Sequence, residues 1–168
     1  RYSNTGYTLM AIIVERVTGK TFRQFTKERI FDPLGMKNTF FRDDFAEIVK
    51  NFAYGYERTE KGTFETSVTN FSTVGPSSLL TTAEDLMLWE ENFYTGKVGW
   101  QAFVDLMLQT EPLNDGGYNR YAFGLSALMH RGQTIVQHEG GDAGYGSHLL
   151  RFPDQHLSLA TLCNTNRA

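Results

Sequence analysis

The first part of the chain carries apolar side chains at the spacing of an α-helix. Leu9, Ile12, Ile13 and Val17 recur every three or four positions, which places them along one side of a helix. Gly19 follows them, and glycine readily adopts the left-handed conformation in which many helices end. We therefore predict a helix over about residues 6–18.

A second helical segment follows at once. Thr21 is a good N-cap residue, and Phe22, Phe25 and Ile30 then recur on roughly one face. Proline does not extend a helix from its interior, so the segment is expected to end at Asp32-Pro33, before the turn at Gly35-Met36. The pattern predicts a pair of helices.

The middle of the chain contains a stretch without a periodic pattern, followed by two predicted helices. Residues 38–70 show no sustained period, although 52–56 and 62–68 could pair as a small hairpin. Gly75-Pro76-Ser77-Ser78 is typical of a turn, and Thr82 stands three residues before Asp85, the spacing of a capping box. A helix should follow and end near 94–96. The residues that indicate another helix after it are Trp100, Phe103, Val104, Met107 and Leu108.

From Tyr121 onward, short alternating runs replace the helical spacing. The predicted strands are 122–129, 133–138, 146–152 and 157–164, with turns expected at 131–132, 140–142 and 153–154. Connections this short suit antiparallel hairpins, since parallel strands need long crossovers. The fold class is therefore α+β, a single unit in which a mainly helical region of about 1–120 packs against an antiparallel sheet of about 121–168.

The composition is that of a folded domain and gives no sign of nucleic-acid binding or of a membrane span. The 168 residues are 40% hydrophobic and 14% aromatic, enough to build a core. Sixteen basic and 19 acidic residues give a net charge of −3, which offers nothing to attract nucleic acid. The longest apolar run, residues 9–14, is far below the roughly 20 residues of a membrane span. Cys163 is the single cysteine, so an internal disulfide is excluded.

Two short motifs near the ends of the chain suggest chemistry. Tyr2-Ser3-Asn4 stands at the beginning, and His138-Glu139-Gly140 is followed by Gly141 near the end. Together with the stretch 2–36 and the turn at 75–78, they resemble serine hydrolases of the class C β-lactamase, DD-peptidase and esterase type. That family carries its nucleophile in Ser-x-x-Lys upstream of the tyrosine. No Ser or Thr of this sequence is followed three residues later by Lys.

The resemblance implies an incomplete β-lactamase/transpeptidase-like fold. In the family, the first strands of the sheet precede the tyrosine and a closing helix follows the last strand. Without them, a sheet edge would expose unpaired backbone groups. We expect that edge to be covered by a missing N-terminal segment or by self-association.

The resemblance also assigns roles to five residues. Tyr2 would be the base or proton shuttle, which requires cations beside it because a free phenol has a pKa of about 10. Asn4 would hold the substrate amide, with both side chains on one side of an extended segment. His138 stands where many members have lysine, Gly140 allows close approach of a substrate, and the Gly141 N–H would be an oxyanion donor.

Plainer interpretations of these residues compete with the catalytic ones. Ser3-Asn4 in front of a helix is also an ordinary helix cap. Glu139 should point away from His138 by strand alternation. A zinc-protease interpretation of His138-Glu139 fails because Asp142 stands where the second histidine would be, and because two glycines break the helix that such a site needs. His130, His148 and His156 lack ligand spacing. We expect neither a metal nor a cofactor.

Two functions of different class follow. The first is part of a serine hydrolase that cleaves amide or ester bonds in a small-molecule or peptide substrate through an acyl-enzyme. In that case the full-length parent is the enzyme and this chain alone is inactive. The alternative is a non-catalytic family homologue that binds a peptidoglycan-like or protein ligand. Localisation stays open, since any signal peptide would lie upstream of Arg1.

Overall fold

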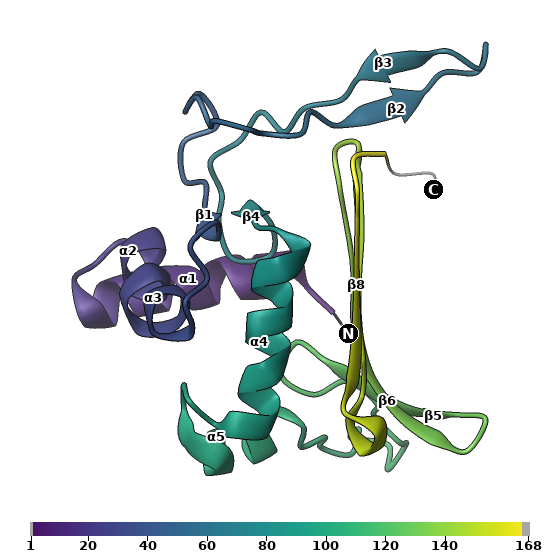
Figure 1. Cartoon of the computed structure of the whole chain (residues 1–168). Helices are drawn as coiled ribbons and strands as arrows, with labels where there is room; N and C mark the ends of the chain where they lie inside the picture. The colour runs from purple at the N-terminus through teal and green to yellow at the C-terminus, as the bar shows by residue number, and fades with distance from the viewer. Residues whose placement is uncertain (1, 166–168) are drawn as a thin grey trace.

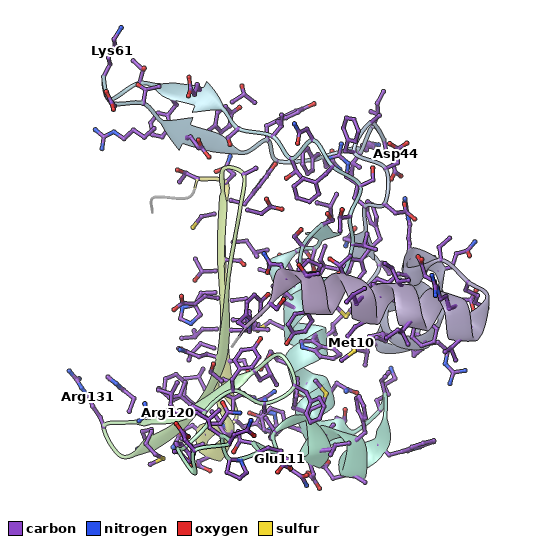
Figure 2. The ribbon with its side chains drawn as sticks, turned by 180° about the vertical axis from the view of Figure 1, so that it is seen from behind. Met10, Asp44, Lys61, Glu111, Arg120 and Arg131 are labelled. Carbon is purple, nitrogen blue, oxygen red and sulfur yellow. The ribbon has the colours of Figure 1, made fainter. Side chains whose placement is uncertain are left out.

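The computed structural model describes residues 2–165 and confirms an α+β architecture. Its largest sheet has four antiparallel strands in the order β5-β6-β7-β8, with α4 packed against one face (Figure 1). The α-helices of the described residues lie on that side of the sheet, and the β2–β3 hairpin lies beyond one end of it (Figures 1 and 2). The opposite face carries no α-helix of residues 2–165.

The first helix, α1 (Asn4–Thr18), follows the sequence prediction closely. It ends at Gly19, whose φ of 69° is left-handed, and it begins at Asn4, two residues earlier than expected. The hydroxyl of Ser3 accepts a hydrogen bond from the Gly6 N–H at 3.2 Å, so Ser3 is the N-cap. The apolar positions of α1 are largely exposed, and Val17 is 80% accessible.

The second helical segment continues past the point where its end was predicted. Thr21 caps α2 (Phe22–Thr26) with a reciprocal capping box to Gln24, and the segment runs on through a π-helical turn, η1 (Lys27–Phe31), into α3 (Asp32–Leu34). The prediction that Asp32-Pro33 ends it was wrong. Pro33 stands in the first turn of α3, a position at which proline is tolerated. The segment ends at Gly35, with φ 84°.

Two small antiparallel pairs fill the stretch between α3 and α4. Strands β1 (Phe40–Phe41) and β4 (Leu79–Leu80) pair with each other. The expected hairpin is present as β2 (Tyr56–Arg58) and β3 (Phe64–Thr66), shorter than predicted and with its first strand displaced toward the C-terminus.

The two later helices match their predictions. They are α4 (Ala83–Thr95), which ends at the left-handed Gly96, and α5 (Trp100–Met107). Thr82 caps α4 by accepting the Asp85 N–H at 3.2 Å. The buried Asp85 carboxylate does not complete a capping box. It accepts the Asn38 N–H and the Thr39 hydroxyl, both at 2.7 Å, and so ties α4 to the loop after α3.

The main sheet corrects one predicted turn. Its strands are β5 (Ser126–His130), β6 (Gln133–Asp142), β7 (Tyr145–Phe152) and β8 (Leu157–Cys163). A turn at 140–142 was expected, but β6 continues through both glycines to Asp142, which pairs with Tyr145. The turn is Ala143-Gly144, because a two-residue hairpin needs a positive φ and Gly144 supplies one of 71°. A short 3₁₀ turn, η2 (Pro153–Gln155), joins β7 to β8.

The core consists of two apolar clusters that share Trp89 of α4. One joins Phe93 and Val104 to Leu125 and Val136 of the sheet region, and the other gathers Phe31, Leu34 and Met36. Because both clusters pack on α4, this helix fixes how α1 to α3 sit relative to the sheet. This arrangement brings the start of α1 close to His138 of β6.

Gly75 shows how tightly the predicted turn at 75–78 packs on α1. Its φ is 114°, and a Cβ there would lie 2.6 Å from the carbonyl oxygen of Tyr7 and 3.3 Å from the Cβ of Ala11. A positive φ costs an L-residue about 1–2 kcal/mol, and the crowding adds about 1 kcal/mol. Gly75→Ala is therefore expected to lower the free energy of unfolding by about 2–3 kcal/mol, measured by urea denaturation.

Gly19 provides a matched control for that substitution. Its φ is also positive, yet a Cβ added at Gly19 would meet no atom within 4 Å. Gly19→Ala should therefore cost only the backbone penalty of about 1–2 kcal/mol. Equal losses in the two variants would show that the close approach to Tyr7 contributes nothing.

Candidate active site

Tyr2 and His138, which stand 136 positions apart in the sequence, meet between α1 and the sheet. Their ring centroids are 6.2 Å apart. Tyr2 directly precedes the N-cap of α1, and His138 projects from β6 on the face that packs against α4, since it shares that face with Val136 of the core. Tyr2 is about half exposed and His138 is half-buried, so the pair borders solvent.

Two more tyrosines complete the cluster, and sequence reasoning did not single them out. The Tyr121 hydroxyl lies 2.9 Å from His138 Nε2 and 3.1 Å from the Tyr7 hydroxyl. The Tyr2 ring lies 5.4 Å from that of Tyr7 and 5.9 Å from that of Tyr121. Tyr7 carried no signal, because a residue five positions after Tyr2 does not share its face of a helix. Tyr121 had none, since it stands in an irregular segment.

The surroundings of Tyr121 favour its protonated phenol. Burial raises the pKa of Tyr121, and the hydrogen bond to Tyr7 and the nearby Tyr7 and Tyr2 phenols raise it further. Tyr121 is therefore a neutral hydrogen-bonding group at physiological pH. It can orient a neighbour but cannot act as the base.

Asn4 is the first residue of α1, and Ser3, which separates it from Tyr2, is extended, with φ −147° and ψ 114°. Its side chain is exposed, and its carbonyl accepts the Thr8 hydroxyl at 3.2 Å. The cap interpretation applies to Ser3, which leaves the Asn4 amide uncommitted to capping.

The glycines after His138 lie in β6, beside β7. Gly140 pairs with Ser147, whose hydroxyl would have to rotate aside to make room for a Cβ at Gly140. Gly141 pairs with Gly146 and has open space around it. Both glycines therefore leave the strand backbone bare, as close approach by a ligand requires.

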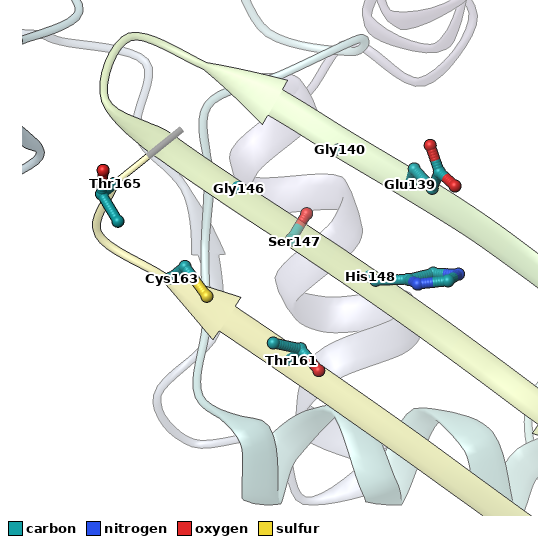
Figure 3. Close-up of a pocket in the computed structure, with 8 residues that line it drawn as sticks. All are labelled: Glu139, Gly140, Gly146, Ser147, His148, Thr161, Cys163 and Thr165. Carbon is teal, nitrogen blue, oxygen red and sulfur yellow. The ribbon is translucent and has the colours of Figure 1, made fainter. Parts of the chain in front are cut away.

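Glu139 points away from the tyrosine cluster, as strand alternation predicted. It pairs with His148, and both line a shallow hollow on the uncovered face of the sheet together with Thr161 and Cys163 (Figure 3). Figure 3 shows these side chains in front of the sheet and the helices behind it. Glu139 thus belongs to the opposite surface from His138.

The described residues contain no group of three or more His, Cys, Asp or Glu side chains arranged to hold a metal ion. Within the same part of the chain, none of the helices has the length and apolarity needed to cross a membrane.

Helices packed on one face of an antiparallel sheet, with a tyrosine and a histidine meeting between them, match the fold of the β-lactamase and penicillin-binding protein class. The chain belongs to the Beta-lactamase family, whose model matches residues 1–168.

Named relatives agree with this assignment. The chain is 30% identical to penicillin-binding protein 4* of Bacillus subtilis, covering 97% of this chain and 39% of that protein. It is 23% identical to a D-aminopeptidase of Gluconobacter oxydans, covering 97% of this chain and 31% of the relative. The chain thus spans well under half the length of these curated relatives.

Solved structures show the same fold. An octameric penicillin-binding protein homologue from Pyrococcus abyssi superimposes with a TM-score of 0.86 at 24% identity, over 98% of this chain and 38% of that one. A D-amino acid amidase from Ochrobactrum anthropi gives a TM-score of 0.79 at 21% identity, over 98% of this chain and 52% of that one. The partial coverage agrees with the incomplete fold that the sequence resemblance implied.

Proposed function

We propose that this chain forms the tyrosine and histidine half of a serine hydrolase active site, which cleaves amide or ester bonds through an acyl-enzyme. The observation that carries the proposal is the meeting of Tyr2 and His138 at 6.2 Å between α1 and β6. A site of this kind needs a proton acceptor for the nucleophile and donors for the oxyanion. Tyr2 and the backbone of Gly141 are the residues to which we assign these two roles.

The remaining site residues handle the substrate in this proposal. Asn4 offers an amide with both donor and acceptor atoms at the start of α1. A neutral imidazole at His138 donates a hydrogen bond without the full charge of lysine, which favours substrates that need no carboxylate clamp. The names of the relatives, a penicillin-binding protein and D-aminopeptidases, are consistent with amide substrates of peptide type.

The nucleophile and its lysine must come from outside this sequence, since Ser-x-x-Lys is not present in it. The 168-residue chain alone should therefore show no hydrolase turnover and no stoichiometric labelling by a serine-reactive fluorophosphonate. Mass spectrometry of the purified chain after incubation with the probe measures this. One adduct per chain would contradict the assignment of the missing nucleophile.

The alternative is a non-catalytic homologue that binds a peptidoglycan-like or protein ligand in the remaining cleft. The absence of Ser-x-x-Lys from the sequence is the observation that favours it. Sequencing the coding region upstream of the Arg1 codon separates the two. An upstream Ser-x-x-Lys supports the hydrolase, and a start codon in its place supports the binding protein, unless a second chain supplies the motif.

We also propose that the exposed apolar side of α1 and the open edge at β8 are covered in the assembled protein. Leu9, Met10 and Ile13 are each more than half exposed, which is unusual for a helix that folds alone. A segment preceding Tyr2 or a second copy of the chain could cover these surfaces. The related octameric protein from P. abyssi makes the second option concrete.

A further inference from the structure

The Tyr121 hydroxyl stands in the middle of a hydrogen-bonded chain that ends on His138. It lies 2.9 Å from His138 Nε2 on one side and 3.1 Å from the Tyr7 hydroxyl on the other. Each phenol has one proton to donate, so Tyr121 can donate to His138 or to Tyr7 but not to both. The direction decides which nitrogen of His138 carries the proton of the neutral ring.

The backbone of Tyr121 is also fixed by hydrogen bonds. The Asn119 side chain accepts the Tyr121 N–H at 3.0 Å and donates to the Tyr121 carbonyl at 2.9 Å. Tyr121 also forms a bridge to Ser126 at the start of β5. These contacts fix the residue although it lies in no regular element, and a fixed phenol can orient the imidazole opposite it.

We infer that Tyr121 is a positioning residue that donates its proton to His138 Nε2, and so holds the neutral imidazole in the tautomer protonated at Nδ1. The bare ring nitrogen of an imidazole is a stronger acceptor than a phenol oxygen, whose lone pairs are drawn into the ring. Tyr7 then donates to the Tyr121 oxygen. The inference deepens the proposed function and rests on it for its catalytic meaning, since the tautomer selects the nitrogen that a substrate meets.

The rings of Tyr2 and Tyr121 contact the His138 ring, and Tyr7 lies beyond Tyr121. Burial favours the protonated form of Tyr121, whose hydroxyl lies within hydrogen-bonding distance of His138 Nε2. A neutral donor at this distance favours the acceptor form of Nε2.

The test measures the tautomer of His138 in the 168-residue chain labelled with ¹⁵N-histidine. Long-range ¹H–¹⁵N correlation spectra report it at about pH 8.5, where an ordinary imidazole is neutral. The His138 peaks are assigned by their loss in His138→Asn. We expect the Nδ1–H form in the unmodified chain. Tyr121→Phe keeps the ring but removes the donor, and should move His138 toward the Nε2–H form that free histidine prefers.

His148 is an internal reference in the same spectra. Its Nε2 lies 3.1 Å from the side-chain amide oxygen of Gln137, which can only accept a hydrogen bond. His148 should therefore show the Nε2–H form in every variant, and a change in its peaks would reveal unfolding. Tyr118→Phe is the matched control because Tyr118 is 76% exposed, and it should leave His138 unchanged. Tyr7→Phe should retain the Nδ1–H form, since Tyr121 still donates.

Two results would overturn the inference. One is an Nε2–H tautomer of His138 in the unmodified chain. The other is a His138 tautomer that does not change between the unmodified chain and Tyr121→Phe, while the His148 peaks stay in place. Neither result depends on hydrolysis. If no nucleophile is encoded upstream, the proposed function fails even when the tautomer shift is observed. If the tautomer shift is not observed, the inference fails even when an upstream nucleophile is found.

Discussion

Replacing Arg151 with Met is expected to lower the free energy of unfolding at neutral pH by about 3–5 kcal/mol, the cost of stranding one partner of a buried ion pair. Arg151 Nη1 lies 3.2 Å from a Glu90 carboxylate oxygen, and the two side chains are 3% and 5% exposed. The guanidinium also stacks over the Phe93 ring at 3.6 Å. The pair thus joins the sheet to α4 at the centre of the core.

The loss should depend on pH in one direction. Burial already raises the pKa of the Glu90 carboxyl above its ordinary 4.5, and Arg151 opposes that rise. Removing Arg151 raises the pKa further. The folded variant then binds a proton that the unfolded chain has released, so its stability is best preserved below about pH 4.5 and falls as the pH rises through the pKa of the folded-state carboxyl.

Urea unfolding at several pH values measures both effects. Lys27→Met is the control, because the Lys27–Asp32 pair is more than half exposed and should contribute less than about 1 kcal/mol. The double variant Glu90→Leu with Arg151→Met removes both buried charges and should recover most of the loss. A single variant as stable as the original protein would show that the ion pair does not join sheet and helix.

Replacing Tyr2 with Phe in a full-length gene product that carries Ser-x-x-Lys is expected to lower kcat by about 100- to 10 000-fold, the usual contribution of a general acid or base. Phenylalanine keeps the ring contacts of Tyr2 with Tyr7 and His138. It removes only the hydroxyl that would accept and return the proton of the nucleophile. Steady-state kinetics with p-nitrophenyl acetate and D-phenylalanine amide measure the loss.

Tyr118→Phe is the matched control for this substitution as well, because its exposed ring lies outside the cluster. It should leave kcat unchanged, and both variants should unfold at the same urea concentration as the original protein. A Tyr2→Phe enzyme of full activity would remove Tyr2 from the proton path and leave it a packing residue.

The local elements could be predicted because their signals are local. Helix α1 ends where Gly19 allows a left-handed residue, α4 begins where Thr82 accepts a backbone N–H, and the alternation in β6 separates His138 from Glu139. Each feature depends on the propensity of a few neighbouring residues. Two predicted ends were wrong because proline and glycine usually interrupt helices and strands. Here Pro33 lies within α3, and Gly140 and Gly141 lie within β6.

By itself, the sequence determined the α+β class, the family resemblance and the two motifs that flank the site. Only the tertiary structure decided that Tyr7 and Tyr121 join Tyr2 and His138, and that Glu90 faces Arg151 across the core. The physical reason is that these contacts link residues far apart in the chain. They form only when α1 and α4 take their places against the sheet, and no periodic pattern in the sequence records that packing.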